Sequence, residues 1–270
     1  CRVTGMPDTA FQDTDIVRIT DKVKNLLTPT PAFSKDGNTM VFARGNSGKS
    51  KDPSPDVDLY ISTKRDGSWS TPERLAISDS IGWDGSPAFS RDGKTLYFSS
   101  NRRGGKGGLD LYRAPMDNSG RFGRPINLGS TINTRGNELF PYVSEDGKLY
   151  FSSDGHPSLG GLDLFVASRS GDEIQIEHLG VPINSVGDDF GLFLADSTQG
   201  YFSSNRVGGK GDDDIYSFVK GKPVCNQSIS GMAIDRKSKK PLTDVTILAY
   251  NSFSEVLGET KTNYEGKYAI

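Results

Sequence analysis

The sequence predicts an all-β protein in which a β-propeller is followed by a partial β-sandwich. One unit recurs four times along the 270 residues, with Phe33 and Phe89 separated by 56 positions and Phe89 and Val143 by 54. A period of this length is typical of propeller blades. Three of the four units carry an Asp-Gly turn between alternating apolar runs, and the chain contains 32 Gly and 14 Pro. Both features indicate many short strands joined by tight turns.

The most regular part of the unit is residues 99–112 (SSNRRGGKGGLDLY), which residues 152–165 and 203–216 repeat at the same length. The units themselves begin at Pro31, Pro87, Pro141 and Phe190. A β-sandwich also has frequent turns. It does not require the same Asp-Gly, Ser-Ser and Asp-Leu-Tyr elements at matching places, so the repeat favours the propeller.

Turn chemistry locates the strands within a unit. An Asp-Gly pair joins strands expected over 87–90 and 95–99, because Gly accepts the positive φ that a tight hairpin requires. A third strand is expected over 110–114 and a fourth over 122–128, where Pro125 suits a sheet edge. Residues 69–75 are the counterpart of this fourth strand in the first unit. Four antiparallel strands form one propeller blade.

The two ends of the propeller lead us to expect five blades, four of them visible as repeat units. Residues 15–19 (DIVRI) resemble a third strand, so residues 1–28 would represent part of an earlier blade. The fourth unit ends at Phe218 without a fourth strand, and propellers commonly complete one blade with strands from both chain ends. A four-bladed ring is the alternative.

The pattern changes after residue 222. Three alternating strands are expected over 229–235, 240–248 and 262–270, which would form an open sheet with an unpaired edge. The predicted domains are therefore a propeller over 1–222 and the incomplete start of a sandwich over 223–270. We expect the sequence to be a segment of a longer protein at both ends.

Composition excludes several classes of function. The 32 basic and 34 acidic residues give a net charge of −2, which is unlike the basic footprint of a nucleic-acid binder. Two cysteines cannot supply a disulfide framework or a four-ligand zinc site. Three interpretations of Cys1 stay open: a truncation point, which the start of the chain inside a blade favours, the lipidated first residue of a bacterial lipoprotein, and a disulfide with Cys225.

No catalytic or cofactor-binding constellation is expected. His156 and His178 are the two histidines, and neither is near a Ser or Cys nucleophile motif. Residues 43–50 resemble a phosphate-binding loop, but Pro53 and Pro55 prevent the helix that such a loop needs. The aspartates at the entry to each third strand would anchor the backbone rather than bind a metal ion; these are Asp58, Asp110, Asp163 and Asp214.

The Gly-rich loops carry basic side chains that we expect to lie in solvent on one rim of the ring. Loops held by a rigid frame are where binding residues concentrate. The candidate partner-binding residues are Arg102, Arg103, Lys106, Arg206 and Lys210.

These motifs resemble known families. The repeat units resemble TolB-type, WD-like propeller repeats over about four fifths of the chain. The Gly-rich loops, together with Pro-Ile-Asn at 125–127 and 182–184, resemble OmpA-family outer-membrane-associated proteins of the Bacteroidetes. Residues 229–270 resemble the start of a carboxypeptidase regulatory-like domain. This order of domains is similar to that of PorE-like components of the type IX secretion system.

The resemblance implies a periplasmic, outer-membrane-associated protein that reaches peptidoglycan through a domain outside this segment. We therefore expect a non-enzymatic scaffold with protein partners in the cell envelope and no cofactor, whose membrane association comes from a lipid anchor or from partners. The alternative is a carbohydrate-active or peptidoglycan-processing propeller with a site in its central channel. That alternative predicts acidic and aromatic side chains converging in the channel.

Overall fold

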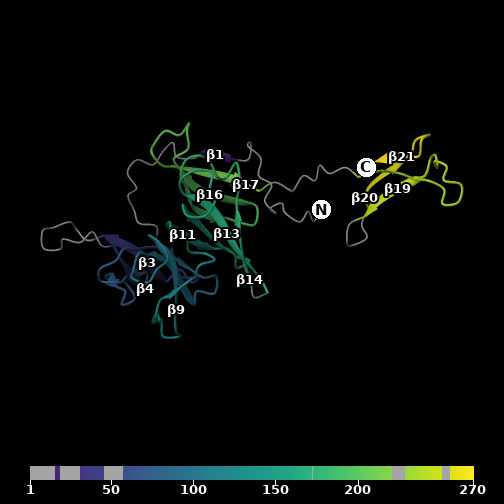
Figure 1. Ribbon diagram of the computed structural model, residues 1–270. Coiled ribbons are helices and arrows are strands. Elements are labelled where there is room, and N and C mark those ends of the chain that lie inside the picture. Colours follow the sequence, from purple (N-terminus) through teal and green to yellow (C-terminus); the bar gives the residue numbers. More distant parts are fainter. Residues whose placement is uncertain (1–15, 19–30, 46–56, 172, 221–228, 251–255) are drawn as a thin grey trace. The chain divides into compact units, whose positions relative to one another are not determined.

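The computed structural model describes residues 16–18, 31–45, 57–171, 173–220, 229–250 and 256–270. The chain forms two compact units that divide between Gly221 and Lys222, and each unit is described by itself (Figure 1). The described residues form strands and turns and contain no helix. Consistent with this, no helix in the described part of the chain has the length and hydropathy of a membrane span.

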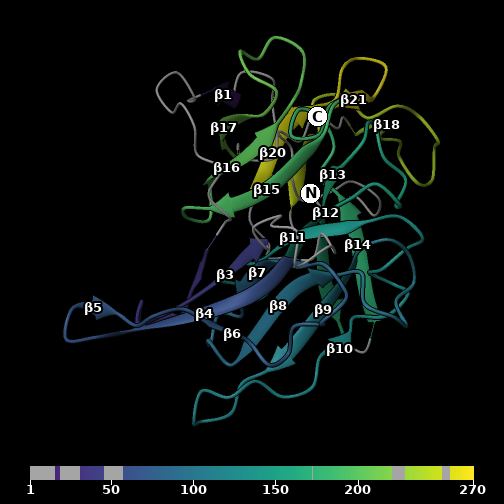
Figure 2. The same ribbon diagram turned by 90° about the vertical axis from the view of Figure 1, so that its left-hand side faces the viewer.

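The larger unit consists of four antiparallel sheets, or blades, which Figures 1 and 2 show as separate groups of strands. Blade 1 contains β2 (Ala32–Phe33), β3 (Thr39–Gly45), β4 (Val57–Arg65), β5 (Ser68–Trp69) and β6 (Glu73–Arg74). Blade 2 contains β7 (Asp84–Phe89), β8 (Thr95–Ser100), β9 (Asp110–Pro115) and β10 (Ile126–Asn127). Blade 3 contains β11 (Glu138–Val143), β12 (Leu149–Ser153), β13 (Asp163–Ser170) and β14 (Glu173–His178).

Blade 4 corrects the predicted number of blades from five to four in the described part of the chain. It contains β15 (Asp189–Leu194), β16 (Gln199–Ser204) and β17 (Asp214–Val219), and β1 (Ile16–Arg18) is its outermost strand. β1 pairs antiparallel with β17, from Ile16 opposite Phe218 to Arg18 opposite Tyr216, and the purple β1 lies beside the green β17 in both ribbon views. The N-terminal strand therefore completes the last blade, as the closure argument predicted. It is a fourth strand rather than part of a fifth blade.

The outer strands of blades 1 and 2 are shorter than the sequence predicted. In place of a strand over 122–128, β10 covers two residues, and in place of 69–75, β5 and β6 cover two each. Proline at 72 and 125 removes a backbone donor from each segment, which limits the number of ladder hydrogen bonds.

Each of the three six-residue inner strands, β7, β11 and β15, contains a bulge at the same place. The register shifts between Gly85 and Ala88 in β7, and at the corresponding positions of β11 and β15. The bulge residues have left-handed backbone angles, with φ of 49° at Ser86, 50° at Phe140 and 65° at Gly191. A bulge increases local twist and disrupts pairing on the free edge, so the inner strands face the centre of the ring as blunted edges.

The apolar core lies between neighbouring blades. One cluster joins Leu59 of blade 1 to Phe98 of blade 2. A second joins Leu111 of blade 2 to Phe151 of blade 3, and a third joins Leu164 of blade 3 to Phe202 of blade 4. These side chains are at most 1% exposed, so packing between blades fixes their relative positions.

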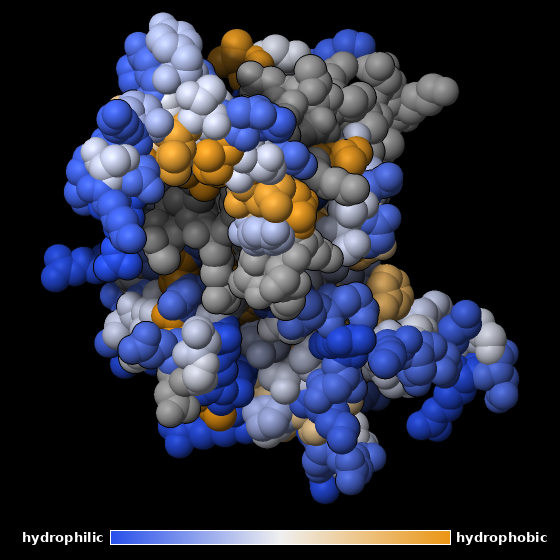
Figure 3. Space-filling view, turned by 90° about the vertical axis from the view of Figure 1, so that its right-hand side faces the viewer, coloured by the Kyte–Doolittle hydropathy of each residue, from blue (hydrophilic) through white to orange (hydrophobic). Residues whose placement is uncertain are grey.

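The smaller unit has four described strands in two small sheets, where three strands were predicted. β18 (Ser230–Met232) pairs with β21 (Lys267–Ala269), and β19 (Thr246–Tyr250) pairs with β20 (Val256–Lys261). Figure 3 shows apolar side chains at the molecular surface. The large apolar residues that this unit exposes are Ile229, Met232, Ile234, Leu242, Leu248, Tyr250, Val256 and Tyr264.

Candidate functional site: the loop face and the central cavity

Two sets of loops meet on one face of the propeller, here called the loop face. One set joins the second and third strands of a blade and comprises residues 101–109, 154–162 and 205–213. The other set leads into the inner strands and comprises residues 79–83, 133–137 and 184–188. Hydrogen bonds connect the two sets, as between the amide of Gly108 and the carbonyl of Gly136 at 2.8 Å.

Arg102 and Arg206 are not solvated rim residues, so that prediction was wrong. The Arg102 guanidinium lies 2.8 Å from the carboxylate of Asp84, and that of Arg206 lies 2.6 Å from the carboxylate of Asp189. The arginine side chains are 13% and 16% exposed, and both aspartates are fully buried. A cation beside a buried carboxylate offsets the cost of removing its charge from water, which draws these arginines inward.

Each arginine lies over two neighbouring aromatic rings. The Arg206 guanidinium lies 4.9 Å from the ring centres of both Phe202 and Tyr216, and Arg102 contacts Phe98 and Tyr112 in the same way. Cation–π contacts of this kind stabilise a desolvated guanidinium. The two arginines therefore fix the loops in place, with most of their surface removed from solvent.

Blade 3 replaces this pair with Glu138 and His156. The fully buried Glu138 accepts hydrogen bonds from the Thr134 amide (2.9 Å), the Thr134 hydroxyl (2.6 Å) and the Ser153 hydroxyl (2.8 Å). Burial raises the pKa of the Glu138 carboxyl despite these bonds. The His156 ring packs on Phe151 and Phe165, where the matching blades place a guanidinium.

The third-strand aspartates lie where the Gly-rich loops re-enter the sheets. Asp110 accepts from the amide of Lys106 at 2.6 Å and of Gly107 at 3.1 Å. Asp214 accepts from the amide of Lys210 at 2.7 Å, and Asp163 accepts from that of Leu159. Asp58 instead forms an ion pair with Arg74 at 2.7 Å. In the described part of the chain, no group of acidic, histidine or cysteine side chains converges as metal ligands would.

Sequence reasoning missed two asparagines that bind the third strands. The side-chain amide of Asn133 pairs with both backbone groups of Leu111, at 2.8 and 3.0 Å. Asn184 does the same for Leu164, at 2.7 and 2.9 Å. Asn184 therefore corresponds to Asn133 and not to Asn127, although the Pro-Ile-Asn motifs suggested the latter. The available signal was an Ile-Asn pair that recurs at 132–133 and 183–184, with each asparagine five residues before the start of an inner strand.

Side-chain pairs lock the loop that enters an inner strand to the loop that follows the second strand of the same blade. The amide of Asp188 donates to the Asn205 side chain at 2.6 Å, and the Asn205 amide group donates to the Asp188 carboxylate at 2.8 Å. Asn137 and Asp154 form the same pair of bonds one blade earlier, at 2.6 and 2.8 Å. These two pairs are called the clasps below.

The paired glycines of the loops permit a close approach between neighbouring blades. A Cβ atom at Gly107 would clash with the backbone of Arg135, and one at Gly160 would clash with the carbonyl of Gly187. A Cβ atom at Gly161 would clash with the Asp188 carboxylate. The glycines at these positions therefore allow neighbouring blades to pack, in addition to any role in turning the loop.

The exposed part of the loop face is both basic and aliphatic. Of the predicted rim residues, Arg103, Lys106 and Lys210 are exposed, and Arg135 joins them from a loop that the sequence did not single out. Leu159, Val186 and Val207 are 50%, 78% and 94% exposed. These three residues lie on adjoining loop segments, since Gly160 adjoins the backbone of Val186 and Gly187 adjoins that of Arg206.

A cavity of 590 Å³ occupies the centre of the propeller and is lined by the inner strands of all four blades. It extends from the bulge residues Ser86, Phe140 and Gly191 to the hairpin turns that carry Lys35, Arg91 and Glu145. The aromatic residues of its lining are Phe33, Phe89, Phe140, Tyr142, Phe190 and Phe193. Glu145 is the sole carboxylate among the described lining residues, and it pairs with Arg91 at 2.9 Å.

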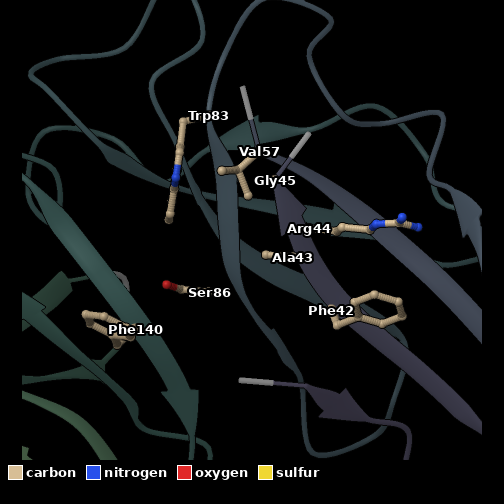
Figure 4. A pocket seen from close by; sticks show the side chains of 8 residues that line it. All are labelled: Phe42, Ala43, Arg44, Gly45, Val57, Trp83, Ser86 and Phe140. Atoms are coloured by element: carbon tan, nitrogen blue, oxygen red, sulfur yellow. The ribbon is translucent and has the colours of Figure 1, made fainter. Parts of the chain in front are cut away.

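A second pocket of 380 Å³ adjoins the cavity and shares Ser86 and Phe140 with it. Figure 4 shows Trp83, Ser86 and Phe140 on one side of this pocket and the residues of β3, Phe42 to Gly45, on the other. Cys1, Cys225 and most of the phosphate-loop-like stretch, residues 46–50, lie outside the described residues.

The fold and these loops define a four-bladed β-propeller followed by a small β unit. No family model matches the sequence, and no curated protein matches it significantly. Among solved structures, the chain is similar to TolB from Acinetobacter baumannii, with 16% identity and a TM-score of 0.40 over 79% of this chain and 51% of that one.

Two enzymes are similar to the same degree. A puromycin-hydrolyzing peptidase from Mycobacterium tuberculosis has 17% identity and a TM-score of 0.45 over 67% of this chain and 25% of its own. An α-L-arabinofuranosidase from Lactobacillus brevis has 14% identity and a TM-score of 0.46 over 73% and 75%. The chain thus spans a quarter of the peptidase and about half of TolB. Similarity at this level carries no argument about activity.

Proposed function

We propose that this propeller is a non-enzymatic interaction module that serves as a scaffold in a bacterial cell-envelope complex. The observation that carries the proposal is the loop face, whose loops are fixed by buried ion pairs and clasps while aliphatic and basic side chains lie in solvent. A surface that is already ordered loses little conformational entropy when a partner binds.

The composition of the exposed surface supports a protein partner. Exposed aliphatic side chains that gather on one face mark interaction sites more often than singly scattered ones do. Leu159, Val186 and Val207 are exposed on adjoining loop segments of this face. Arg103 and Arg135 lie on the same face and would favour a partner with acidic residues beside an apolar patch.

The family resemblance extends the proposal to the cellular setting. It supports a periplasmic, outer-membrane-associated protein of the OmpA family, similar to PorE-like components of the type IX secretion system. Such a protein would link a secretion machine to peptidoglycan through a domain outside this segment. A lipid on Cys1 or the partners themselves would supply membrane association.

A carbohydrate-active propeller is the second candidate, and the aromatic lining of the central cavity favours it. Glycoside hydrolysis commonly requires two carboxylates on either side of the scissile bond. The described lining residues supply only one carboxylate, that of Glu145, and no second one to act with it. The scaffold is therefore the better supported function.

Affinity capture from the native envelope, followed by mass spectrometry, tests the scaffold. The loop-face variant combines Arg103→Glu, Val186→Ser and Val207→Ser, which are exposed positions. The control variant combines Lys64→Glu and Arg121→Glu, which are exposed positions outside the loop face. We expect one set of envelope proteins to bind the parent and the control and to be lost from the loop-face variant. Equal recovery with all three proteins would refute the proposal, as would sugar release from envelope polysaccharide by the parent protein.

A further inference from the structure

We propose that the central cavity binds an elongated apolar organic molecule that carries one anionic group, with its anionic end at the hairpin turns. This site is separate from the loop face, so it can be tested independently of the scaffold function. The cavity volume of 590 Å³ lies within the range of small-molecule sites, roughly 300–1,000 Å³.

The shape of the cavity suits an elongated ligand. Its lining follows β11 from Phe140 to Val143 and continues to Glu145 in the hairpin turn, and it includes matching residues of the other inner strands. Five residue steps of extended chain span at most about 16 Å. The free edges of these strands carry bulges and prolines, such as Pro87 and Pro141, which oppose the addition of a peptide strand. A small molecule is therefore favoured over an extended peptide.

The wall of the cavity is apolar and incompletely packed. The Phe193 side chain is 52% exposed and makes an edge contact with Tyr142 at 5.5 Å between ring centres. By contrast, Phe98, Phe151 and Phe202 in the interblade core are at most 1% exposed. An apolar ligand would remove the remaining aromatic surface from water, which is the main favourable term in binding such molecules.

Phe140 is one of the bulge residues that mark the end of the cavity opposite the hairpin turns, here called the inner end, and its backbone is left-handed. Its φ is 50°, whereas the corresponding position of β15 is Gly191, and a bulky residue in this region is strained. The strained backbone places the Phe140 ring 4.9 Å from that of Phe190. The two rings form an aromatic wall that a glycine at position 140 would not provide.

The charges lie at the opposite end. Arg91 and Glu145 form an exposed ion pair at 2.9 Å. Lys35 also lines the cavity and is exposed, and it has no ion pair with any described carboxylate. The inner end presents neutral groups such as Ser86 and Ser203. Among the described lining residues, the hairpin end therefore holds two cations and one carboxylate, and the additional cation complements a carboxylate or sulfonate group on the ligand.

Titration of the purified chain with 8-anilinonaphthalene-1-sulfonate tests the proposal. A Trp69→Phe background leaves Trp83, on the adjoining pocket, as the sole tryptophan. We expect saturable binding at one site that quenches Trp83. Lys35→Glu and Phe193→Ser should each weaken binding about tenfold, and Lys64→Glu should leave it unchanged. The uncharged analogue N-phenyl-1-naphthylamine should bind equally well to the parent and to Lys35→Glu.

Two further arms complete the test. Displacement by dodecanoate but not by 3-phenylpropanoate would identify an acyl ligand, and the reverse would identify an aromatic acid. Met232→Ser and Tyr264→Ser remove exposed apolar groups from the smaller unit and should not affect the signal. The proposal is overturned if these two changes abolish dye binding, if Lys35→Glu and Phe193→Ser do not weaken it, or if the folded parent binds no dye. Circular dichroism of each variant establishes that it is folded.

Discussion

Asp188 and Asn205 join the entry loop of β15 to the loop after β16 through two hydrogen bonds of 2.6 and 2.8 Å. Asn137 and Asp154 form the same clasp one blade earlier, with the carboxylate and the amide exchanged between the two positions. In both clasps, the first residue also accepts a backbone amide from the preceding blade, that of Leu162 or Leu109. Each of these two clasps therefore combines one carboxylate and one amide, in either order.

This exchange predicts a rescue. Asn205→Asp alone places two carboxylates against each other, and we expect it to lower the free energy of unfolding by roughly 1–2 kcal/mol. Combining it with Asp188→Asn recreates the order seen at Asn137 and Asp154, and it should restore most of the lost stability. Denaturant unfolding of the two single variants and the double variant checks this. Simple additivity of the two losses would contradict the clasp.

The second prediction concerns the loop glycines. Gly160→Ala should lower the free energy of unfolding by about 1–3 kcal/mol, because the new methyl group collides with the carbonyl of Gly187. Gly211 occupies the matching position in blade 4. A Cβ atom there would have its nearest described neighbour, the Asp213 carbonyl oxygen, at 3.5 Å. Gly211→Ala is therefore the matched control and should change stability little. Equal losses in thermal unfolding would show that loop flexibility, and not interblade contact, requires the glycine.

The third prediction concerns the buried ion pairs. Arg206→Met leaves the fully buried Asp189 without its cation, and we expect a loss of about 3–5 kcal/mol in the free energy of unfolding. Adding Asp189→Asn removes the uncompensated charge and should recover part of that loss. Arg103→Met, at an exposed position of the corresponding loop, should change stability by less than about 0.5 kcal/mol. If Arg206→Met were as mild as Arg103→Met, the original interpretation of Arg206 as a solvated rim residue would be reinstated.

The fourth prediction is a pH dependence at Glu138. Burial raises the pKa of its carboxyl in the folded state, so the folded protein binds the proton more tightly than the unfolded chain does. The free energy of unfolding of the parent, relative to Glu138→Gln, should therefore rise as the pH falls through the folded-state pKa. The gain should level off below the unfolded value of about 4.3. Denaturant unfolding at several pH values between 7 and 4 measures it. A difference that falls with acidification would mean that the hydrogen bonds from Thr134 and Ser153 outweigh burial.

Much of the propeller was predictable because it depends on neighbours in the sequence. The Asp-Gly hairpins are local: the Ser90 hydroxyl donates to Asp92 two residues away, at 2.6 Å. Such turns repeat wherever the residues repeat, so the positions of the second and third strands followed from the pattern. The outer strands did not, because their length depends on how many backbone donors find a partner in the neighbouring strand.

The functional surface was less predictable. Arg102 and Arg103 are adjacent and chemically alike, yet Arg102 is held against Asp84 while Arg103 is exposed. Nothing in the local sequence separates them, because the partner carboxylate lies 18 positions away. The same holds for the central cavity, whose lining comes from four separated strands.

The sequence by itself determined that the chain is a propeller with repeated Gly-rich loops, because turn chemistry and apolar alternation act within a few residues. Only the tertiary structure decided that β1 completes blade 4, that Arg102 and Arg206 turn inward, and that the glycines at 107 and 160 permit neighbouring blades to touch. These features arise from contacts between segments far apart in the chain. Burial, and not local conformation, decides which side chain meets which partner there.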